Sequence, residues 1–372
     1  MKYSTKEVCY MRGFIGTSQS DNIGEAISQA TKGLKKADLL ILIAPFIKAE
    51  KAAEYLAEKY PGTPMIGTTS ASYISNKTDD TSIMVVALAG VTVSTGILTN
   101  TRKTPVSSIL EFEDILCSME PESNNTVCLE FSTGSEEKVL ATIHSVLKRY
   151  DISLAGSSSY GTPLGDKNQI IYNGKLMADT TVYAFVKNNA GNILVGKENI
   201  YKRLSKKAHF ATLVDRNTKT LFQLDNTPAH EIYTAETGVD KEGIVENMLI
   251  NPLGRAAGDD TFITTTNSLD MNGVMFNGKA IFENESIFIM EPDDIEKVNQ
   301  DTISHINNVL EKTSFTLCFD SVNRFRYIAG IGYLDEYLSN LSSLGTFAGI
   351  LGTGEQINNQ HVNQTMVYVV FE

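Results

Sequence analysis

Apolar and polar positions along the first half of the chain follow two alternating patterns. Residues 38–46 and 82–89 are nearly continuous apolar runs, which are typical of strands buried on both faces. Residues 22–36 and 48–60 carry apolar side chains every three or four positions, which predicts amphipathic helices. Together these patterns predict an α/β arrangement in which helices pack on buried strands.

The same order of elements recurs about ninety residues later. Gly67 begins a Gly-Thr-Thr-Ser turn and Gly156 begins a Gly-Ser-Ser-Ser turn, 89 residues apart, each after a short apolar run. Equal spacing of similar segments indicates a structural repeat. We therefore predict two βαβ-like repeats, at about residues 38–90 and 125–188, whose strands share a sheet or sandwich. A chance alternation of helices and strands is the alternative.

The pattern changes in the second half of the chain. Strands separated by polar turns predominate, with a hairpin expected at residues 215–220, a long helix at residues 293–312 and a buried final strand at residues 366–371. The predicted fold class is therefore α/β and α+β in two domains. The first, at residues 1–220, is α/β, and the second, at residues 221–372, is mainly an antiparallel sheet with flanking helices.

Length and composition narrow the classes of function. A chain of 372 residues exceeds what one ordinary core covers, which favours two domains. A net charge of −12 argues against nucleic acid and anionic membranes as partners. The apolar runs are far shorter than the roughly 20 residues that span a bilayer, and the N-terminus lacks an apolar signal segment, so we expect a cytoplasmic protein. Four scattered cysteines predict neither a disulfide framework nor a metal site, and no cofactor is expected.

The main candidate site lies near the C-terminus. Four glycines stand within ten positions, and Glu355 follows the last of them, Gly354. Asn363 and Thr365 alternate along a short polar segment and therefore share a face. We expect Glu355 to accept a ligand ammonium group and Arg324 to hold a ligand carboxylate, with Arg255 and Arg326 as competing candidates for the second role. In the alternative, these side chains are structural, pairing with the backbone of the loop or forming a surface ion pair.

The two glycine–hydroxyl turns are a second candidate. Thr68 and Thr69 in one turn, and Ser157 and Ser158 in the other, offer hydroxyl and backbone N–H groups to a carboxylate or phosphate. Neither turn has the lysine or third glycine of a nucleotide-binding loop. The alternative is a tight turn between buried strands.

Catalytic groups are sparse in the sequence. Cys318, His361 and Asn363 would supply a nucleophile, a base and an orienting group, but Cys318 lies within an apolar run, where a thiol is usually inert. Ser157 lacks the GxSxG pattern of a nucleophile elbow. No catalytic residue is therefore predicted, and a hydrolase or transferase using cysteine or serine stays the alternative.

Taken together, these motifs resemble the FIST family of sensory and signal-transduction domains, a FIST N domain followed by a FIST C domain. The resemblance rests on features along nearly the whole chain: the Gly67 and Gly156 turns, the hairpin-to-helix segment ATLVDRNTKTLFQLDNTPAHEIY, the Asn251-Pro-Leu turn, Cys318 followed by Arg324, and Gly354-Glu355 with Asn363 and Thr365. It implies a sensor of small ligands, with amino acids as the suggested class.

The resemblance to a sensory family also implies a partner that receives the signal. No receptor, kinase or cyclase module is recognisable on the chain, so a sensory output would pass through a separate signalling partner or a homo-oligomer. The leading hypothesis is thus a non-enzymatic protein that binds a small polar metabolite. A scaffold that binds only protein is a further alternative.

Overall fold

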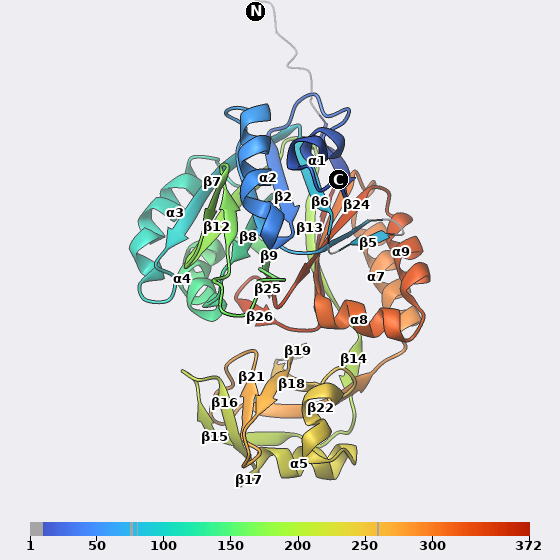
Figure 1. Ribbon diagram of the computed structural model, residues 1–372. Coiled ribbons are helices and arrows are strands. Elements are labelled where there is room, and N and C mark those ends of the chain that lie inside the picture. The colour runs from blue at the N-terminus through green and yellow to red at the C-terminus, as the bar shows by residue number, and fades with distance from the viewer. Residues whose placement is uncertain (1–9, 75–76, 80, 259) are drawn as a thin grey trace, which may run out of the picture.

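The computed structural model describes residues 10–74, 77–79, 81–258 and 260–372. Figure 1 shows a larger body above a smaller domain. The smaller domain, residues 200–292, has its own nine-stranded sheet and core, and we refer to it as the insert. The other described residues form the body, so the chain leaves the body once and returns to it. None of the helices in the described ranges is both long and apolar enough to cross a membrane.

The body consists of three repeats, each running strand, helix, strand, helix, strand, hairpin, strand. The first repeat contains β1 (Arg12–Ser18), α1 (Ile23–Ala30), β2 (Leu39–Ala44), α2 (Phe46–Lys59), β3 (Met65–Thr69), β4 (Ser72–Ile74), β5 (Lys77–Asp79) and β6 (Ile83–Ala89). The second contains β7 (Val91–Thr99), a 3-10 turn η1 (Pro105–Ser108), α3 (Ile109–Cys117), β8 (Thr126–Ser132), α4 (Glu136–Arg149), β9 (Ser153–Ser158), β10 (Ile170–Tyr172), β11 (Lys175–Met177) and β12 (Thr180–Asn188).

The third repeat is split by the insert. It contains β13 (Ile193–Asn199), α7 (Ile295–Val309), β23 (Phe315–Ser321), α8 (Val322–Gly330), α9 (Leu334–Ser342), β24 (Phe347–Gly352), β25 (Glu355–Ile357), β26 (Gln360–Val362) and β27 (Thr365–Phe371). The insert contains β14 (Tyr201–Arg203), β15 (His209–Asp215), β16 (Thr220–Leu224), β17 (Thr227–Pro228), α5 (Ala229–Thr237), η2 (Lys241–Gly243), α6 (Ile244–Asn247), β18 (Leu253–Ala257), β19 (Asp260–Thr264), β20 (Thr266–Leu269), β21 (Met275–Asn277) and β22 (Ser286–Pro292).

Each repeat builds one sheet with the same strand order. In the first sheet β2 and β3 are parallel, β6 lies antiparallel beside β2, and β1 lies antiparallel beside β6. The second sheet repeats this order with β7-β12-β8-β9, and the third with β13-β27-β23-β24. The parallel pairs confirm the two predicted βαβ-like repeats, and β23-β24 adds a third.

The sheets exchange their hairpins in a closed ring. The first sheet ends with β10-β11 from the second repeat, the second with β25-β26 from the third, and the third with β4-β5 from the first. Asn173 and Asn358 take the same place in two of these hairpins. Both have positive φ, and both side chains accept a hydrogen bond from a strand of the neighbouring repeat. The N–H of Met65 on β3 donates to Asn173 at 2.9 Å, and that of Leu154 on β9 donates to Asn358 at 3.1 Å.

The three sheets enclose one central core, and helices cover the outer faces. Inward-facing side chains such as Ile41, Leu129 and Phe319 pack together at the centre. α1 and α2 cover the first sheet, α3 and α4 the second, and α7, α8 and α9 the third, each with a separate apolar core. Burial of these faces drives the association, which explains why the strands are apolar along their whole length.

One expectation from the sequence left two arrangements open, and another needs correction. Of the shared sheet or sandwich expected for the first two repeats, the sandwich is closer, because each repeat forms its own sheet, the two sheets pack in one core and only the hairpins cross over. The boundary expected at residue 220 falls inside β16, which pairs with β15 as the predicted hairpin. The chain instead changes sheets near residue 200 and again near residue 292, and residues 293–372 belong to the body. The coarse class holds, namely a two-domain α+β fold with mostly antiparallel strands.

Candidate functional site

A row of polar side chains crosses the second sheet beneath α4. His361 of β26 pairs with Gln356 of β25, Gln356 with Gly156 of β9, and Gly156 with Glu130 of β8. Directly paired residues point to the same face of a sheet. Cys128 precedes Glu130 by two positions on the same strand and packs in the core under α3 and α4, so the row faces the helices. We call His361, Gln356 and Glu130 the polar row.

The corresponding row of the first sheet is apolar. Leu176, Ile171 and Leu42 stand at the positions of His361, Gln356 and Glu130, in the same register around Gly67. An added Cβ at Gly67 would lie 2.1 Å from the carbonyl oxygen of Leu42, and one at Gly156 would lie 2.5 Å from that of Glu130, so both repeats require glycine there. Because the same fold forms with an apolar row, the polar row is not needed for folding.

Glu130 is the most unusual member of the row. Its side chain is 0% exposed, and neither carboxylate oxygen has a hydrogen-bond partner. Burial, and then the nearby charge of Glu136, raise the pKa of Glu130 well above its ordinary value. An unsatisfied buried carboxyl group costs free energy, which marks this position as one retained for a reason other than stability.

A chain of hydrogen bonds connects the polar row to the start of α4. Gln356 donates from Nε2 to the hydroxyl of Ser158 at 3.0 Å, and Ser158 donates to Glu136 Oε1 at 2.7 Å. Gln356 Oε1 has no partner. Ser158 thus belongs to this cluster, as expected of a hydroxyl at the carboxyl end of a strand.

His361 faces the other acid of the α4 N-terminus. Its Nδ1 lies 3.6 Å from Oε1 of Glu137, whose Oε2 lies 3.4 Å from Nζ of Lys219 in the insert. Burial raises the pKa of Glu137, but His361 and Lys219 outweigh it and the pKa is lowered overall. Donor atoms of Glu136, Glu137 and His361 all lie within 4.8 Å of one another.

The insert closes this face with cationic and amide groups. Nζ of Lys279 contacts the backbone oxygen of His361 and lies 3.5 Å from Oε1 of Gln360. Burial, followed by repulsion from Arg255, lowers the pKa of Lys279 to about 7. Nη1 of Arg255 and Nδ2 of Asn277 are buried without partners. The insert therefore adds hydrogen-bond donors at the end of the polar row that carries His361.

The predicted C-terminal loop lies beside the polar row. Glu355 is fully buried and accepts from the N–H of Thr365 at 3.4 Å, while its Oε1 has no partner. Burial, and then Asp320, raise the pKa of Glu355. Because Glu355 and Gln356 are consecutive on β25, their side chains point to opposite faces. Glu355 therefore faces away from the polar row.

Gly354 and Asn363 position the hairpin against its surroundings. A Cβ at Gly354 would lie 2.1 Å from Nε2 of His361, so the imidazole packs directly on this glycine. Asn363 donates from Nδ2 to the backbone oxygen of Thr353 at 3.3 Å, and its own N–H donates to Ile263 of the insert at 3.1 Å. Its Oδ1 has no partner.

The other turn residues are buried and bond to backbone groups. The hydroxyl of Thr69 donates to the carbonyl of Gln169, and those of Thr68 and Ser157 to the carbonyl of the following residue, each at 3.3 Å. Ser158 also donates its N–H to Gly354 at 2.9 Å. The bonds of Thr69 and Ser158 join strand ends to the neighbouring repeat, whereas those of Thr68 and Ser157 are local.

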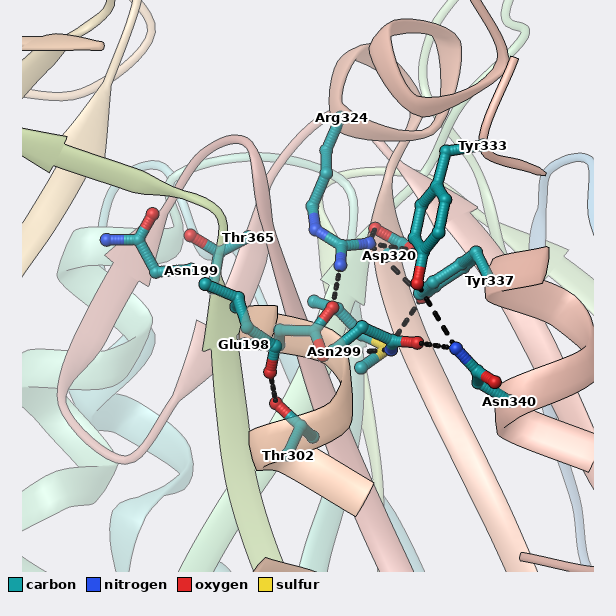
Figure 2. A network of polar contacts seen from close by, with 12 residues as sticks. Glu198, Asn199, Asn299, Thr302, Asp320, Arg324, Tyr333, Tyr337, Asn340 and Thr365 are labelled. Atoms are coloured by element: carbon teal, nitrogen blue, oxygen red, sulfur yellow. Dashed lines mark hydrogen bonds and ion pairs between the residues drawn. The ribbon is translucent and has the colours of Figure 1, made fainter. Parts of the chain in front are cut away.

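Arg324 belongs to a separate buried network at the root of the insert, shown in Figure 2. It donates from Nη1 to Asp320 at 2.8 and 3.0 Å and to the hydroxyl of Tyr337 at 3.2 Å, and it pairs through Nη2 with Glu198. Asn299 donates to Glu198 at 3.2 Å. Since Glu198 stands at the end of β13, the network fixes the point where the chain enters the insert.

Cys318, the candidate nucleophile of the alternative function, lies close to the same network. Cys318 is fully buried on the third sheet, and burial, followed by the charge of Asp320, raises the pKa of its thiol. His361 lies on the second sheet against Glu137. Cys318 and His361 therefore lie on different sheets with different neighbours, which does not favour a nucleophile–base pair.

The residues that sequence reasoning missed are mainly acids. Glu130 is a lone charge inside the apolar run TVCLEF, which is a usable signal because buried strands seldom carry an unpaired acid. Glu136 and Glu137 look like ordinary residues of a first helical turn, where acids are favoured. Lys279 follows an Asn-Gly turn and gives no signal of burial.

Comparison with known proteins agrees with the resemblance noted from the sequence. A family model described as the FIST N domain matches residues 38–227. The search for similar curated proteins returned no match. The matched segment covers β2 through β17, and so includes Glu130, the α4 acids and Ser158.

Proposed function

The chain belongs to the FIST family of sensory and signal-transduction domains, and from that premise we propose that it senses an α-amino acid bound between body and insert. The single observation that carries the proposal is the polar row, where an unpaired buried glutamate replaces the leucine of an equivalent repeat. The protein acts in the cytoplasm without catalysis and passes its signal to a separate partner.

The chemistry of the two walls supports an amino acid as the ligand. On the body, Glu130, Gln356 and Asn363 carry unpartnered acceptor oxygens, which suit an ammonium group. On the insert, Asn277 Nδ2 and Arg255 Nη1 are unpartnered donors near Lys279 and suit a carboxylate, although the other guanidinium nitrogens of Arg255 pair with Glu285. An amino acid has both groups on one carbon atom, so it would satisfy donors and acceptors on facing walls.

In this proposal, ammonium and carboxylate binding pass from Glu355 and Arg324, where the sequence analysis placed them, to other residues. Gln356 and Glu130, rather than Glu355, receive the ammonium group, because Glu355 points to the face of β25 opposite the polar row. Arg324 is engaged by Asp320 and Glu198, so the carboxylate falls to the insert. Glu355, Thr365 and Gly354 shape the hairpin that carries Gln356 and His361.

A ligand that bridges two domains favours the arrangement in which they are closed. It shifts the equilibrium only by its differential affinity for that arrangement. The insert is joined to the body through β14 and β22, so a small rotation there would change the surface presented to a partner. This gives a physical route from occupancy to signal.

Isothermal titration of the full chain with a panel of amino acids tests the proposal. A charge-assisted hydrogen bond contributes about 1.5–3 kcal/mol, so Glu130→Gln should weaken binding about 10- to 100-fold. Glu54→Gln on the exposed face of α2 is the matched control and should leave affinity unchanged. If no amino acid binds the wild-type protein, or if Glu130→Gln binds as tightly as wild type, the proposal is wrong.

A further inference from the structure

The contact between α4 and β26 differs in kind from its equivalent in the first repeat. There, α2 meets β11 through apolar side chains, including Ala57 and Leu176. In the second repeat, the same helix-to-hairpin contact is made by Glu136, Glu137 and His361. Two carboxylates and an imidazole thus replace a contact that the fold makes elsewhere with hydrocarbon.

We propose that these three residues bind a divalent metal ion, each through one donor atom. Their donor atoms lie within 4.8 Å of one another, which small rotations of the side chains convert to ligand–ligand spacing around an ion. The ligands come from a helix end and a hairpin that are themselves fixed by interlocked sheets. The metal site shares His361 with the polar row, but none of its three ligands is a group assigned above to the amino acid.

A second observation also favours cation binding at this position. His361 is 5% exposed, yet neither ring nitrogen has a hydrogen-bond partner. Glu130, fully buried and also unpartnered, feels the charge of Glu136. Buried imidazole and carboxylate groups without partners are expensive, and one ion at this point would satisfy the imidazole and offset the repulsion between the acids.

The neighbouring lysine leaves room for the ion. Lys219 is paired with Oε2 of Glu137, whereas Oε1 faces Nδ1 of His361 and also accepts the N–H of Ala280 at 3.2 Å. Ser158 donates to Glu136 Oε1, a contact of the kind that orients a carboxylate ligand. The ion would therefore lie on the His361 side of the two acids.

The donor set indicates the class of metal. One imidazole nitrogen with two carboxylate oxygens suits Zn²⁺, Mn²⁺ or Fe²⁺ better than the all-oxygen preference of Ca²⁺ or Mg²⁺. Three protein ligands leave coordination positions open for water or a small molecule.

Equilibrium dialysis of the chelator-treated full chain tests the inference. We expect about one Zn²⁺ or Mn²⁺ per chain by elemental analysis, and visible d–d absorption when Co²⁺ is added instead. His361→Leu, which copies Leu176 of the first repeat, and Glu137→Gln should each weaken the affinity at least about tenfold, since losing even the outer-shell contacts of a metal site costs this much. His305→Leu, at an exposed position of α7, is the matched control.

The outcomes separate this inference from the proposed function. A wild-type chain that retains no ion after dialysis, or variants that retain as much as wild type, would overturn the metal assignment. Circular dichroism of each variant excludes misfolding as the cause of lost binding. Titration of an amino acid into the metal-free protein tests amino-acid binding separately. Metal binding and amino-acid binding can therefore each fail without the other.

Discussion

Replacing Glu130 by leucine should stabilise the protein while abolishing its binding of amino acids. Glu130 is 0% exposed and unpartnered, and Leu42 occupies the same position of the first sheet. Removing an unsatisfied buried polar group recovers about 1–3 kcal/mol. The leucine side chain adds about 1 kcal/mol or more from burial, less any local misfit. We expect Glu130→Leu to raise the free energy of unfolding by about 2–4 kcal/mol.

Urea denaturation followed by circular dichroism measures this change, in chelator and without added ligand so that binding does not stabilise the wild type. The denaturant slope should stay constant while the midpoint rises. The reciprocal variant Leu42→Glu puts an unpaired acid into an apolar row and should destabilise the protein. A Glu130→Leu protein less stable than wild type, at equal slope, would refute the claim that the polar row costs stability.

Three further predictions concern the network and the buried acids and thiols. Arg324→Met leaves Asp320 and its neighbours as unpaired buried acids and should lower the free energy of unfolding by about 3–5 kcal/mol in urea; a loss below about 1 kcal/mol would contradict the network's role. Because burial raises the folded-state pKa of Glu355, its stabilising contribution is complete below the unfolded pKa and is lost as pH rises through the folded one. The free energy of unfolding of Glu355→Gln should therefore rise relative to that of wild type between pH 5 and pH 8. A difference between the two that is constant with pH would disprove this. The exposed Cys117 should react quickly with a thiol reagent and the buried Cys318 only on unfolding, so rapid labelling of Cys318 in a Cys117→Ala protein would contradict its placement.

Much of the body follows from local patterns in the sequence. The expected strand at residues 38–46 is β2, and the helix expected at residues 48–60 is α2, because continuous and periodic apolar patterns are strong signals. The repeat was recognisable for the same reason. Its third copy was not, because the insert separates β13 from α7 and hides the spacing.

Other features depend on contacts that no local pattern encodes. The exchanged hairpins pair with strands of another repeat, so their place follows only from the assembled sheets. α8 follows β23 without a loop and buries Arg324, whereas the sequence predicted no helix there. The boundary between body and insert was misplaced because strands on either side of residue 200 look alike.

The sequence indicated part of the structure around the candidate site. Gly354, Glu355, Asn363 and Thr365 do gather on one buried hairpin and the segment after it, as the glycine-rich pattern indicated. Glu130, the acid on which the proposed function rests, lies far away in the sequence and reaches the hairpin only because β25 pairs with β9 beside β8. Such a pairing between repeats is what single-sequence reasoning cannot supply.

The most direct test of the account is a crystal structure of the full chain grown with the amino acid that binds most tightly in titration. We predict density between the body and the insert, with the ammonium group at Glu130 and Gln356 and the carboxylate toward Asn277 and Arg255. An amino acid bound elsewhere, with the polar row dry and unchanged, would contradict the central claim.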